Sequence, residues 1–234
     1  MAEPYLLNVS NWETINLVPD RSSQFILQAE SGGTPKTTED SYWDGTIQWL
    51  TPKEITRGNG ALFVSETERK ITESGLRSSG AKLMPVGTVM LSKRAPVGAV
   101  AIAAVPMTTN QGFLNFVCGL QLRPVYFAEW LKVNKPYLDA VANGSTYAEL
   151  YKTDLFEFEM NVPPIEEQDL ILEVLMSMNR LINGCVMLEQ SSARVEEIED
   201  LQKRKRELES LQSTLSPILL SGAIKDLRGL LVGV

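Results

Sequence analysis

Apolar residues before the Pro163-Pro164 pair form short runs, separated every few positions by Gly, Pro or Thr. Short runs between turn-forming residues are typical of β-strands, because turn residues end an extended segment. Two further stretches, 127–133 and 136–142, have the spacing of short helices. The pattern predicts a mixed α+β domain dominated by short strands. The expected strands are 47–50, 61–64, 88–91, 97–105, 113–122 and 156–162.

The pattern changes after this proline pair, where a long helix is predicted. Glu166, Glu167 and Asp169 would lie in its first turn, where the positive end of the helix dipole favours acidic side chains. From there to Ser221, apolar residues recur mostly at spacings of three and four, as in the seam of a coiled coil. The predicted seam residues are Val174, Met178, Leu181, Cys185, Leu188, Leu201, Leu208, Leu211, Leu215 and Ile218.

This helix is too long for the preceding domain to cover. Unbroken over 166–221, it would be about 84 Å long at about 1.5 Å per residue. Either Gly184 or the stretch 189–193 is expected to break it. We expect its apolar stripe to meet another helix, and a helix folded back on its own domain is the alternative. The predicted division is a mixed α+β domain at 1–163 and a helical region at 164–234.

Composition narrows the chemistry that the chain can carry. It is 44% hydrophobic and 22% charged, values that are ordinary for a soluble globular protein. There is no histidine, which excludes histidine bases, Ser-His-Asp triads and imidazole metal ligands. Two cysteines, Cys118 and Cys185, cannot supply a zinc tetrahedron and do not suggest a disulfide framework.

The start of the chain and its apolar runs bear on location. No basic segment followed by an apolar stretch begins the chain, so no signal peptide is predicted. The longest apolar run, 97–105, is far shorter than the roughly 20 residues of a membrane helix. We therefore expect a soluble, cytoplasmic protein without membrane contact.

Charge is distributed unevenly along the chain. The formal net charge of −7 by itself argues against non-specific nucleic-acid binding. Residues 69–94, however, carry six basic side chains against Glu73 alone, with the hydroxyls of Ser78 and Ser79 among them. This basic belt suits phosphates and base edges, and a solvated surface with counter-charges supplied by folding is the alternative. The basic run 203–206 is flanked by acidic residues, so pairing along a solvated helix is favoured there.

Nine short segments follow one another in a characteristic order and spacing. The segments are 31–35 (Ser-Gly-Gly-Thr-Pro), 42–49 (Tyr-Trp-Asp-Gly-Thr-Ile-Gln-Trp), 71–76 (Ile-Thr-Glu-Ser-Gly-Leu), 81–89 (Ala-Lys-Leu-Met-Pro-Val-Gly-Thr-Val), 94–98 (Arg-Ala-Pro-Val-Gly), 109–113 (Thr-Asn-Gln-Gly-Phe), 144–147 (Gly-Ser-Thr-Tyr), 163–168 (Pro-Pro-Ile-Glu-Glu-Gln) and 219–222 (Leu-Leu-Ser-Gly). Together they resemble one target-recognition domain and one helical spacer of a type I restriction-modification specificity subunit, over roughly residues 12–225.

The resemblance implies a non-catalytic protein that reads a bipartite sequence in double-stranded DNA. Residues 1–163 would form the DNA target-recognition domain, and 164–234 the helical spacer for dimerisation and partner docking. The expected partners are modification subunits, which methylate adenine with S-adenosylmethionine, and through them a restriction subunit. This chain is expected to bind no cofactor itself.

The chain departs from the family in having one domain and one spacer where the full-length subunit has two of each. It resembles a half-subunit, which would need to form a homodimer through its helical region. A symmetric dimer would read a palindromic interrupted site, because a two-fold axis in the protein matches one in the DNA.

Candidate DNA-binding residues are the basic side chains, hydroxyls and amides of the recognition domain. Asn110 and Gln111 can pair with adenine, although we favour a structural role in which they bond backbone groups. Trp43 and Trp49 are expected in the core rather than on a stacking surface. The candidates are Lys36, Arg69, Lys70, Arg77, Ser78, Ser79, Lys82, Lys93, Arg94, Asn110 and Gln111.

Two other functions fit parts of the sequence. Asp44, Glu68 and Lys70 match the loose pattern of metal-dependent nucleases, which need no histidine. The acidity of the chain would suit a protein-only mimic that occupies modification subunits without reading DNA.

Overall fold

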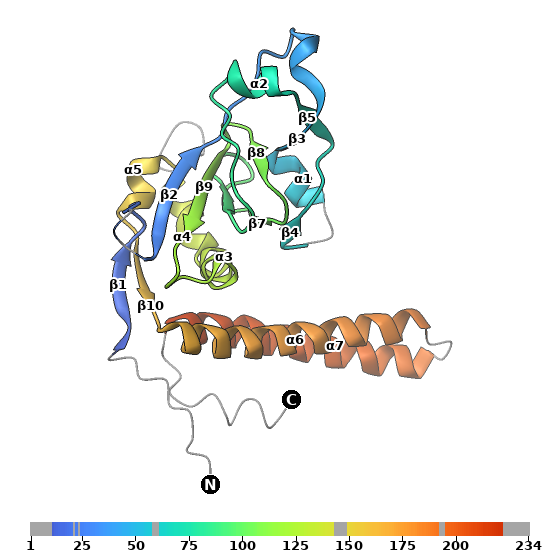
Figure 1. Ribbon diagram of the computed structural model, residues 1–234. Coiled ribbons are helices and arrows are strands. Elements are labelled where there is room, and N and C mark those ends of the chain that lie inside the picture. The colour runs from blue at the N-terminus through green and yellow to red at the C-terminus, as the bar shows by residue number, and fades with distance from the viewer. Residues whose placement is uncertain are drawn as a thin grey trace. The chain divides into compact units, whose positions relative to one another are not determined.

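The chain forms two compact units in a computed structural model, which describes residues 11–20, 22, 24–57, 61–142, 149–191 and 195–221 (Figure 1). One unit is Ile15–Met160, and the other combines the described residues of Met1–Thr14 and Asn161–Val234. The predicted segment 144–147 and Gly222 lie outside the described residues. Strands followed by long helices confirm the predicted α+β class.

A five-stranded sheet forms the larger core of the first unit. Its strand order is β2 (Ile26–Ser31), β9 (Phe113–Cys118), β6 (Val89–Ser92), β7 (Val100–Ala103) and β4 (Phe63–Val64). Neighbours pair antiparallel, except for the parallel pair β4 and β7. Every residue of β6 and β7 is buried, which explains why both read as continuous apolar runs. Helix α3 (Pro124–Val133) packs on these two strands.

A second, three-stranded sheet has the order β5 (Arg69–Ile71), β3 (Trp43–Leu50) and β8 (Met107–Thr109). Strand β3 runs antiparallel to β5 and parallel to β8, and its register with β5 shifts between Trp43 and Ile47. With η2 (Asp40–Tyr42) and α2 (Glu73–Arg77), this sheet makes the small-sheet region. Its core consists of Trp43, Ile47, Trp49, Ile71 and Ala81.

Several predicted strands are wrong in length. The run 97–105 contains only β7, because Gly98 has a φ of +76° in a turn that returns the chain to Ser92. The run 113–122 ends as a strand at Cys118, where a turn follows. The run 156–162 was predicted as one strand, but its first residue ends α5 (Lys152–Phe156), and only β10 (Glu159–Val162) is extended.

Both predicted short helices are confirmed, as α3 and α4 (Lys135–Ala142). Elements that the pattern did not predict include α1 (Pro52–Arg57), α2 and α5, and the strands β2, β5 and β8. Strand β1 (Glu13–Asn16), also unpredicted, pairs with β10 in a two-stranded sheet. These elements are short or rich in polar residues, so periodicity alone carries little signal for them.

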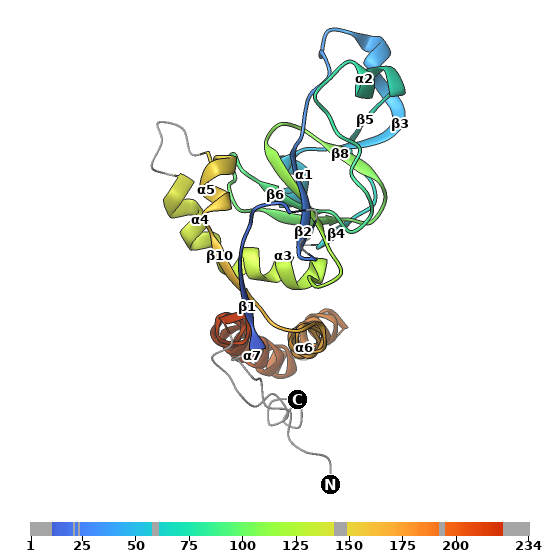
Figure 2. The same cartoon turned by 60° about the vertical axis from the view of Figure 1, so that its left-hand side comes forward.

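The helical unit is built on two helices that lie side by side, α6 (Ile165–Ser191) and α7 (Val195–Ser221), as Figure 2 shows nearly end-on. Gln202 Nε2 donates to Glu189 Oε1 at 2.7 Å, and Gln212 Nε2 to Asn179 Oδ1 at 2.8 Å. Gln202 near the start of α7 thus lies beside Glu189 near the end of α6, and Gln212, further along α7, lies beside Asn179, which precedes Glu189 in α6. The two helices therefore form an antiparallel hairpin.

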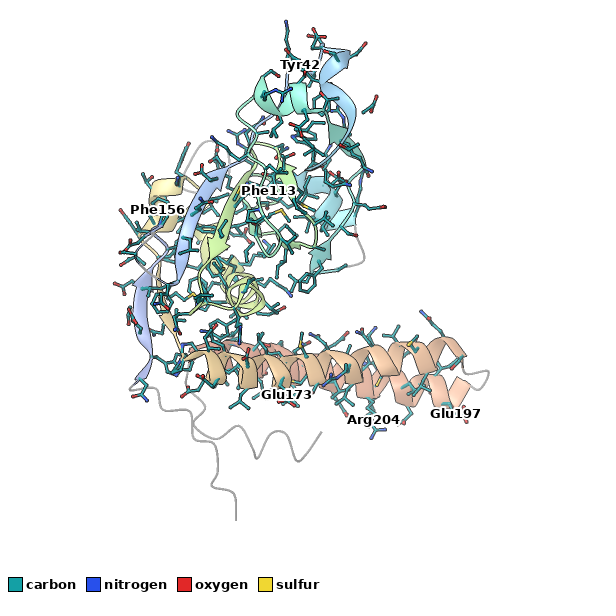
Figure 3. All side chains as sticks on the ribbon, in the orientation of Figure 1. Tyr42, Phe113, Phe156, Glu173, Glu197 and Arg204 are labelled. Carbon is teal, nitrogen blue, oxygen red and sulfur yellow. The ribbon has the colours of Figure 1, made fainter. Side chains whose placement is uncertain are left out.

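The expected break in the helix over 166–221 is confirmed. Helix α6 ends at Ser191, within the predicted break at 189–193, whereas Gly184 stays inside the helix. The expected meeting with another helix is confirmed, and that helix is α7 of the same chain. The exposed charged side chains Glu173, Glu197 and Arg204 are labelled in Figure 3.

The predicted seam is only partly covered by the hairpin. Val174, Met178 and Cys185 are buried. Leu181, Leu188 and Leu211, however, are 39%, 57% and 46% exposed. The remaining seam residues of α7 that were predicted, Leu201, Leu208, Leu215 and Ile218, are half-buried.

Among the described residues, α6 alone is long and apolar enough to cross a membrane by length and composition. Polar residues interrupt the helix, so it contains no continuous apolar run of membrane-spanning length. This is weak evidence for a membrane span, since packed helices of soluble proteins pass the same test.

Candidate nucleic-acid interface

The segment 31–35 crosses the small-sheet region as a tightly enclosed loop. The Gly33 N–H donates to Thr109 O at 2.9 Å, and its carbonyl accepts from Trp49 Nε1, also at 2.9 Å. A Cβ atom on Gly33 would lie 2.2 Å from both the Ala81 nitrogen and the Gly80 carbonyl carbon. Only glycine permits this approach of two backbones. The glycine therefore has a structural role, and the loop leads directly to the candidate Lys36.

Two tryptophans form the centre of this region. The Trp43 and Trp49 rings meet edge to face, with centroids 5.0 Å apart. Trp43 Nε1 donates to the Lys36 carbonyl at 3.3 Å, so both indole N–H groups hold the same loop. The two residues are only 7% and 4% exposed, which confirms the prediction that they belong to the core.

Arg69 lies against this aromatic pair. Its guanidinium carbon is 3.5 Å from the centroid of Trp43 and 5.5 Å from that of Trp49. The residue is exposed and follows Glu68 at the start of β5. Arg69 is thus a surface cation whose position is set by buried rings.

Other candidates gather in the same region but differ in how far they are engaged. Arg77 pairs with Glu73 at 3.8 Å along α2. Lys36, Lys70 and Lys82 make no ion pair with any residue that the structure describes, and Lys36 and Lys82 are exposed.

The two serine candidates already bond the backbone. Ser78 Oγ donates to the Gly75 carbonyl at 3.2 Å, and Ser79 Oγ accepts from the Ala81 N–H at 3.2 Å. The free cations are therefore the main donors that this part of the belt can offer to a ligand.

Lys93 and Arg94 belong to a separate cluster. They follow β6, where Glu149 Oε1 lies 3.8 Å from Lys93 Nζ and 2.9 Å from Arg94 Nε. Burial lowers the pKa of Lys93 from its ordinary value, and Glu149 partly opposes that shift. The basic belt is therefore not one continuous charged surface, because folding supplies a shared counter-charge at this end.

The amide candidates are occupied by local bonds. Asn110 Oδ1 accepts from the Gly112 N–H at 2.9 Å, and Thr34 Oγ1 donates to Gln111 Oε1. The bond of Asn110 to the backbone is the structural role that we favoured, whereas Gln111 bonds a side chain instead. Whether either amide also reaches a base stays a prediction.

Sequence reasoning missed a set of hydrogen bonds that hold the backbone of Arg69. The Thr67 N–H donates to Gln48 Oε1 at 2.9 Å, and Thr67 Oγ1 donates to the Arg69 carbonyl at 2.6 Å. The same Thr67 oxygen accepts from the Trp49 N–H at 3.0 Å. These residues carry no recognisable motif, so only the fold brings them together.

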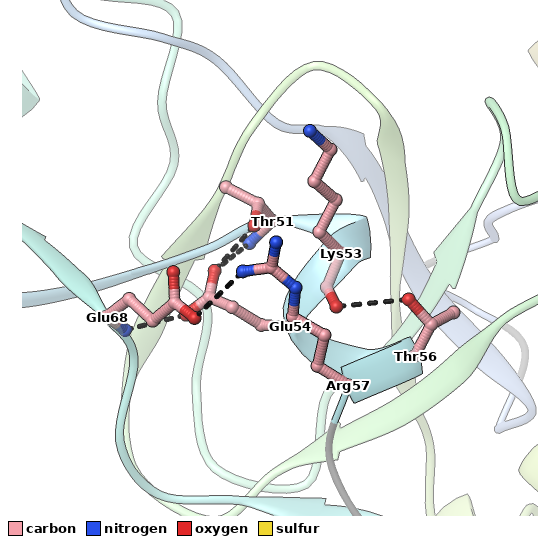
Figure 4. Close-up of polar contacts among 6 residues, drawn as sticks. All are labelled: Thr51, Lys53, Glu54, Thr56, Arg57 and Glu68. Carbon is pink, nitrogen blue, oxygen red and sulfur yellow. Dashed lines mark hydrogen bonds and ion pairs between the residues drawn. The ribbon is translucent and has the colours of Figure 1, made fainter.

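The residues of the nuclease alternative have other contacts. Glu68 pairs with Arg57 at 3.4 Å, and Glu54 accepts from Thr51 and from the Glu68 N–H (Figure 4). Asp44 lies apart from them at the register shift of β3, with a φ of +57°. In the part of the chain that the structure describes, no three His, Cys, Asp or Glu side chains gather as metal ligands.

Comparison with known proteins gives this geometry a context. A family model described as a type I restriction modification DNA specificity domain matches residues 25–197. The MjaIX specificity subunit of Methanocaldococcus jannaschii is 38% identical over 161 residues, which are 68% of this chain and 37% of that protein. The EcoR124I/EcoR124II specificity subunit of Escherichia coli is 28% identical over 160 residues, covering 65% and 39% respectively. The chain thus spans about two fifths of the length of these relatives.

Solved structures share the fold over nearly the whole chain. The HsdS subunit from Thermoanaerobacter tengcongensis matches with a TM-score of 0.54 and 19% identity, over 91% of this chain and 45% of that one. A chain from a study of type I R-M complex assembly matches with a TM-score of 0.52 and 19% identity, over 91% and 46%. Since the family model covers most of the sequence, the chain belongs to the family of type I restriction-modification DNA specificity domains.

Proposed function

We propose that this chain reads one half of a bipartite DNA site for a type I restriction-modification system. The match of the family model to residues 25–197 carries this proposal. The unit Ile15–Met160 would contact DNA through candidate cations that have no ion pair among the described residues, namely Lys36, Arg69, Lys70 and Lys82. Phosphate contacts by such side chains would set the register, and contacts to base edges would give the sequence preference.

A second copy of the chain would supply the other half-site. Support comes from Leu181, Leu188 and Leu211, which are exposed on the helices of the hairpin, because a symmetric dimer through the helices could cover such side chains. The resulting two-fold axis would select a palindromic interrupted sequence.

The chemistry would belong to partner subunits. Modification subunits, docked on the helical unit, would bring S-adenosylmethionine to an adenine, and a restriction subunit would join through them. With a net charge of −7, this chain alone releases few counterions from DNA, so its isolated affinity should be weak. A cytoplasmic location fits this role.

The test is DNA binding by the purified chain, by a modification subunit encoded with it, and by both together. We expect weak, non-selective binding by each alone and sequence-selective binding by the mixture. If the mixture forms a complex but gains no sequence preference, the chain is a protein-only mimic and the proposal is wrong.

A further inference from the structure

Arg69 differs from the other arginines around the candidate interface in what it contacts. Arg57, Arg77 and Arg94 each lie within 3.4, 3.8 and 2.9 Å of a carboxylate oxygen. Arg69 makes no ion pair with any residue that the structure describes, although it is exposed. Its guanidinium carbon lies 3.5 Å from the centroid of the Trp43 ring. The charge of Arg69 is therefore available to a ligand in a way that its neighbours' charges are not.

The arginine is held from both its backbone and its side chain. Its carbonyl accepts from Thr67 Oγ1 at 2.6 Å, and the residue pairs with Trp49 across β3 and β5. The Trp43 ring under the guanidinium is itself fixed by its edge-to-face contact with Trp49 and its bond to the Lys36 carbonyl. These contacts restrict Arg69 before binding, which reduces the side-chain entropy that binding would cost.

Stacking leaves the hydrogen-bonding edge of the guanidinium unused. A cation–π contact uses the flat face of the group, whereas its five N–H donors point outward in the plane. The neighbouring acid does not occupy them, because Glu68 is paired with Arg57 (Figure 4). A planar donor fork of fixed orientation matches the O6 and N7 acceptors of guanine in the major groove.

We propose that Arg69 is a specificity-determining residue that donates two N–H groups to O6 and N7 of one guanine in the DNA site. This inference rests on the proposed function, because it requires that the unit Ile15–Met160 read DNA. Trp43 and Thr67 then act as positioning residues, which fix the plane of the fork without touching the base.

The experiment selects bound sequences from a randomised duplex DNA library, using the full chain with its modification subunit. Wild type is compared with Arg69→Ala and Arg69→Lys. We expect wild type to select a motif with a required guanine, and both variants to lose the preference for that guanine by about tenfold or more while keeping the other positions. Lysine keeps the charge but not the planar fork, so it should not restore the preference.

Lys53→Ala is the matched control, since it removes an exposed cation of the same unit, leaves the pair of Arg57 with Glu68 intact and should retain the wild-type motif. Thermal melting of Arg69→Lys checks folding, and this variant decides the result if Arg69→Ala is unstable. The inference is overturned if Arg69→Lys keeps the full motif, or if Arg69→Ala weakens all sequences equally and lowers the salt slope by about one, as loss of a phosphate contact would. If wild type selects no motif, the proposed function fails and this inference fails with it.

Discussion

In the small-sheet region, the decisive contacts join residues far apart in the sequence, such as the Trp49 indole with Gly33 and the Gly33 backbone with Ala81. In the helical hairpin, most of the structure follows from local periodicity, and polar bonds such as Gln202 with Glu189 tie the two helices together. The small-sheet region can bring several functional side chains close together, but only if its distant segments pack without steric clashes. The helical hairpin should tolerate substitutions at its exposed positions, which form a surface for binding partners. Substitutions should therefore have sharply different consequences in the two regions.

The largest effect is expected from Gly33→Val. Its side chain would collide with the backbone of Gly80 and Ala81, which cannot move without disturbing the sheet. We expect a loss of about 3 kcal/mol or more in the free energy of unfolding, measured by urea denaturation. Gly80→Ala is the control, because a Cβ there meets nothing within 4 Å, and it should cost less than about 1 kcal/mol. Equal losses at both positions would show that the loop crossing is not what makes Gly33 necessary.

Substitutions of the exposed leucines on the hairpin should weaken self-association rather than folding. Leu181→Asp together with Leu188→Asp is expected to weaken self-association by more than about tenfold, because two apolar side chains at the proposed interface become charged. Sedimentation velocity measures this, with circular dichroism to check helix content. Asn183→Asp, which adds a charge at an exposed polar position of α6, should leave the dimer intact. A wild-type chain that stays monomeric at tens of micromolar, a range set by ordinary interface affinities, would contradict the dimer.

Gly184→Ala tests whether the hairpin can be stabilised by a substitution. Gly184 lies inside α6, and a Cβ there meets nothing within 4 Å. Alanine should raise the thermal unfolding free energy by up to about 1 kcal/mol, since glycine is a poor helix former. Destabilisation on this change would mean that the glycine is needed where a partner approaches.

The smallest effects concern the two ends of the basic belt. Lys82→Gln should lower the salt slope of DNA binding by about one, whereas Lys53→Gln, an exposed lysine on α1, should not. Arg94→Gln removes an exposed ion pair with Glu149 and should cost under about 1 kcal/mol of stability, with less change in slope than Lys82→Gln. A larger slope change at Arg94 would put DNA at the Glu149 cluster instead.

How far the sequence could predict the molecule also differs between the regions. The helices α6 and α7 were visible because apolar spacing and acidic first-turn residues are local signals. The break between the two helices was expected in the correct stretch. The hairpin itself was not predicted, because it depends on the packing of one helix face against the other. Strands β6 and β9 were predicted because uninterrupted apolar runs mark buried strands, whereas polar β5 and three-residue β8 depend on pairing with neighbouring strands.

The candidate interface was predicted as a set of basic, hydroxyl and amide side chains, and the fold determines which of them are free to bind a ligand. The match of the family model confirms the prediction of a type I restriction-modification DNA specificity domain. Charge counting could not foresee that Glu149 would pair with Lys93 and Arg94, or that Arg69 would stack on Trp43. Such pairings depend on tertiary contacts between distant segments.

The most direct test of the half-site account is the pattern of adenine methylation in cells that express this chain with a modification subunit. The account predicts a bipartite, palindromic methylated motif that disappears when the chain is omitted, because two identical copies would each read one half. An asymmetric motif that requires this chain would contradict the symmetric dimer. Methylation that is unchanged without the chain would contradict its role in sequence recognition.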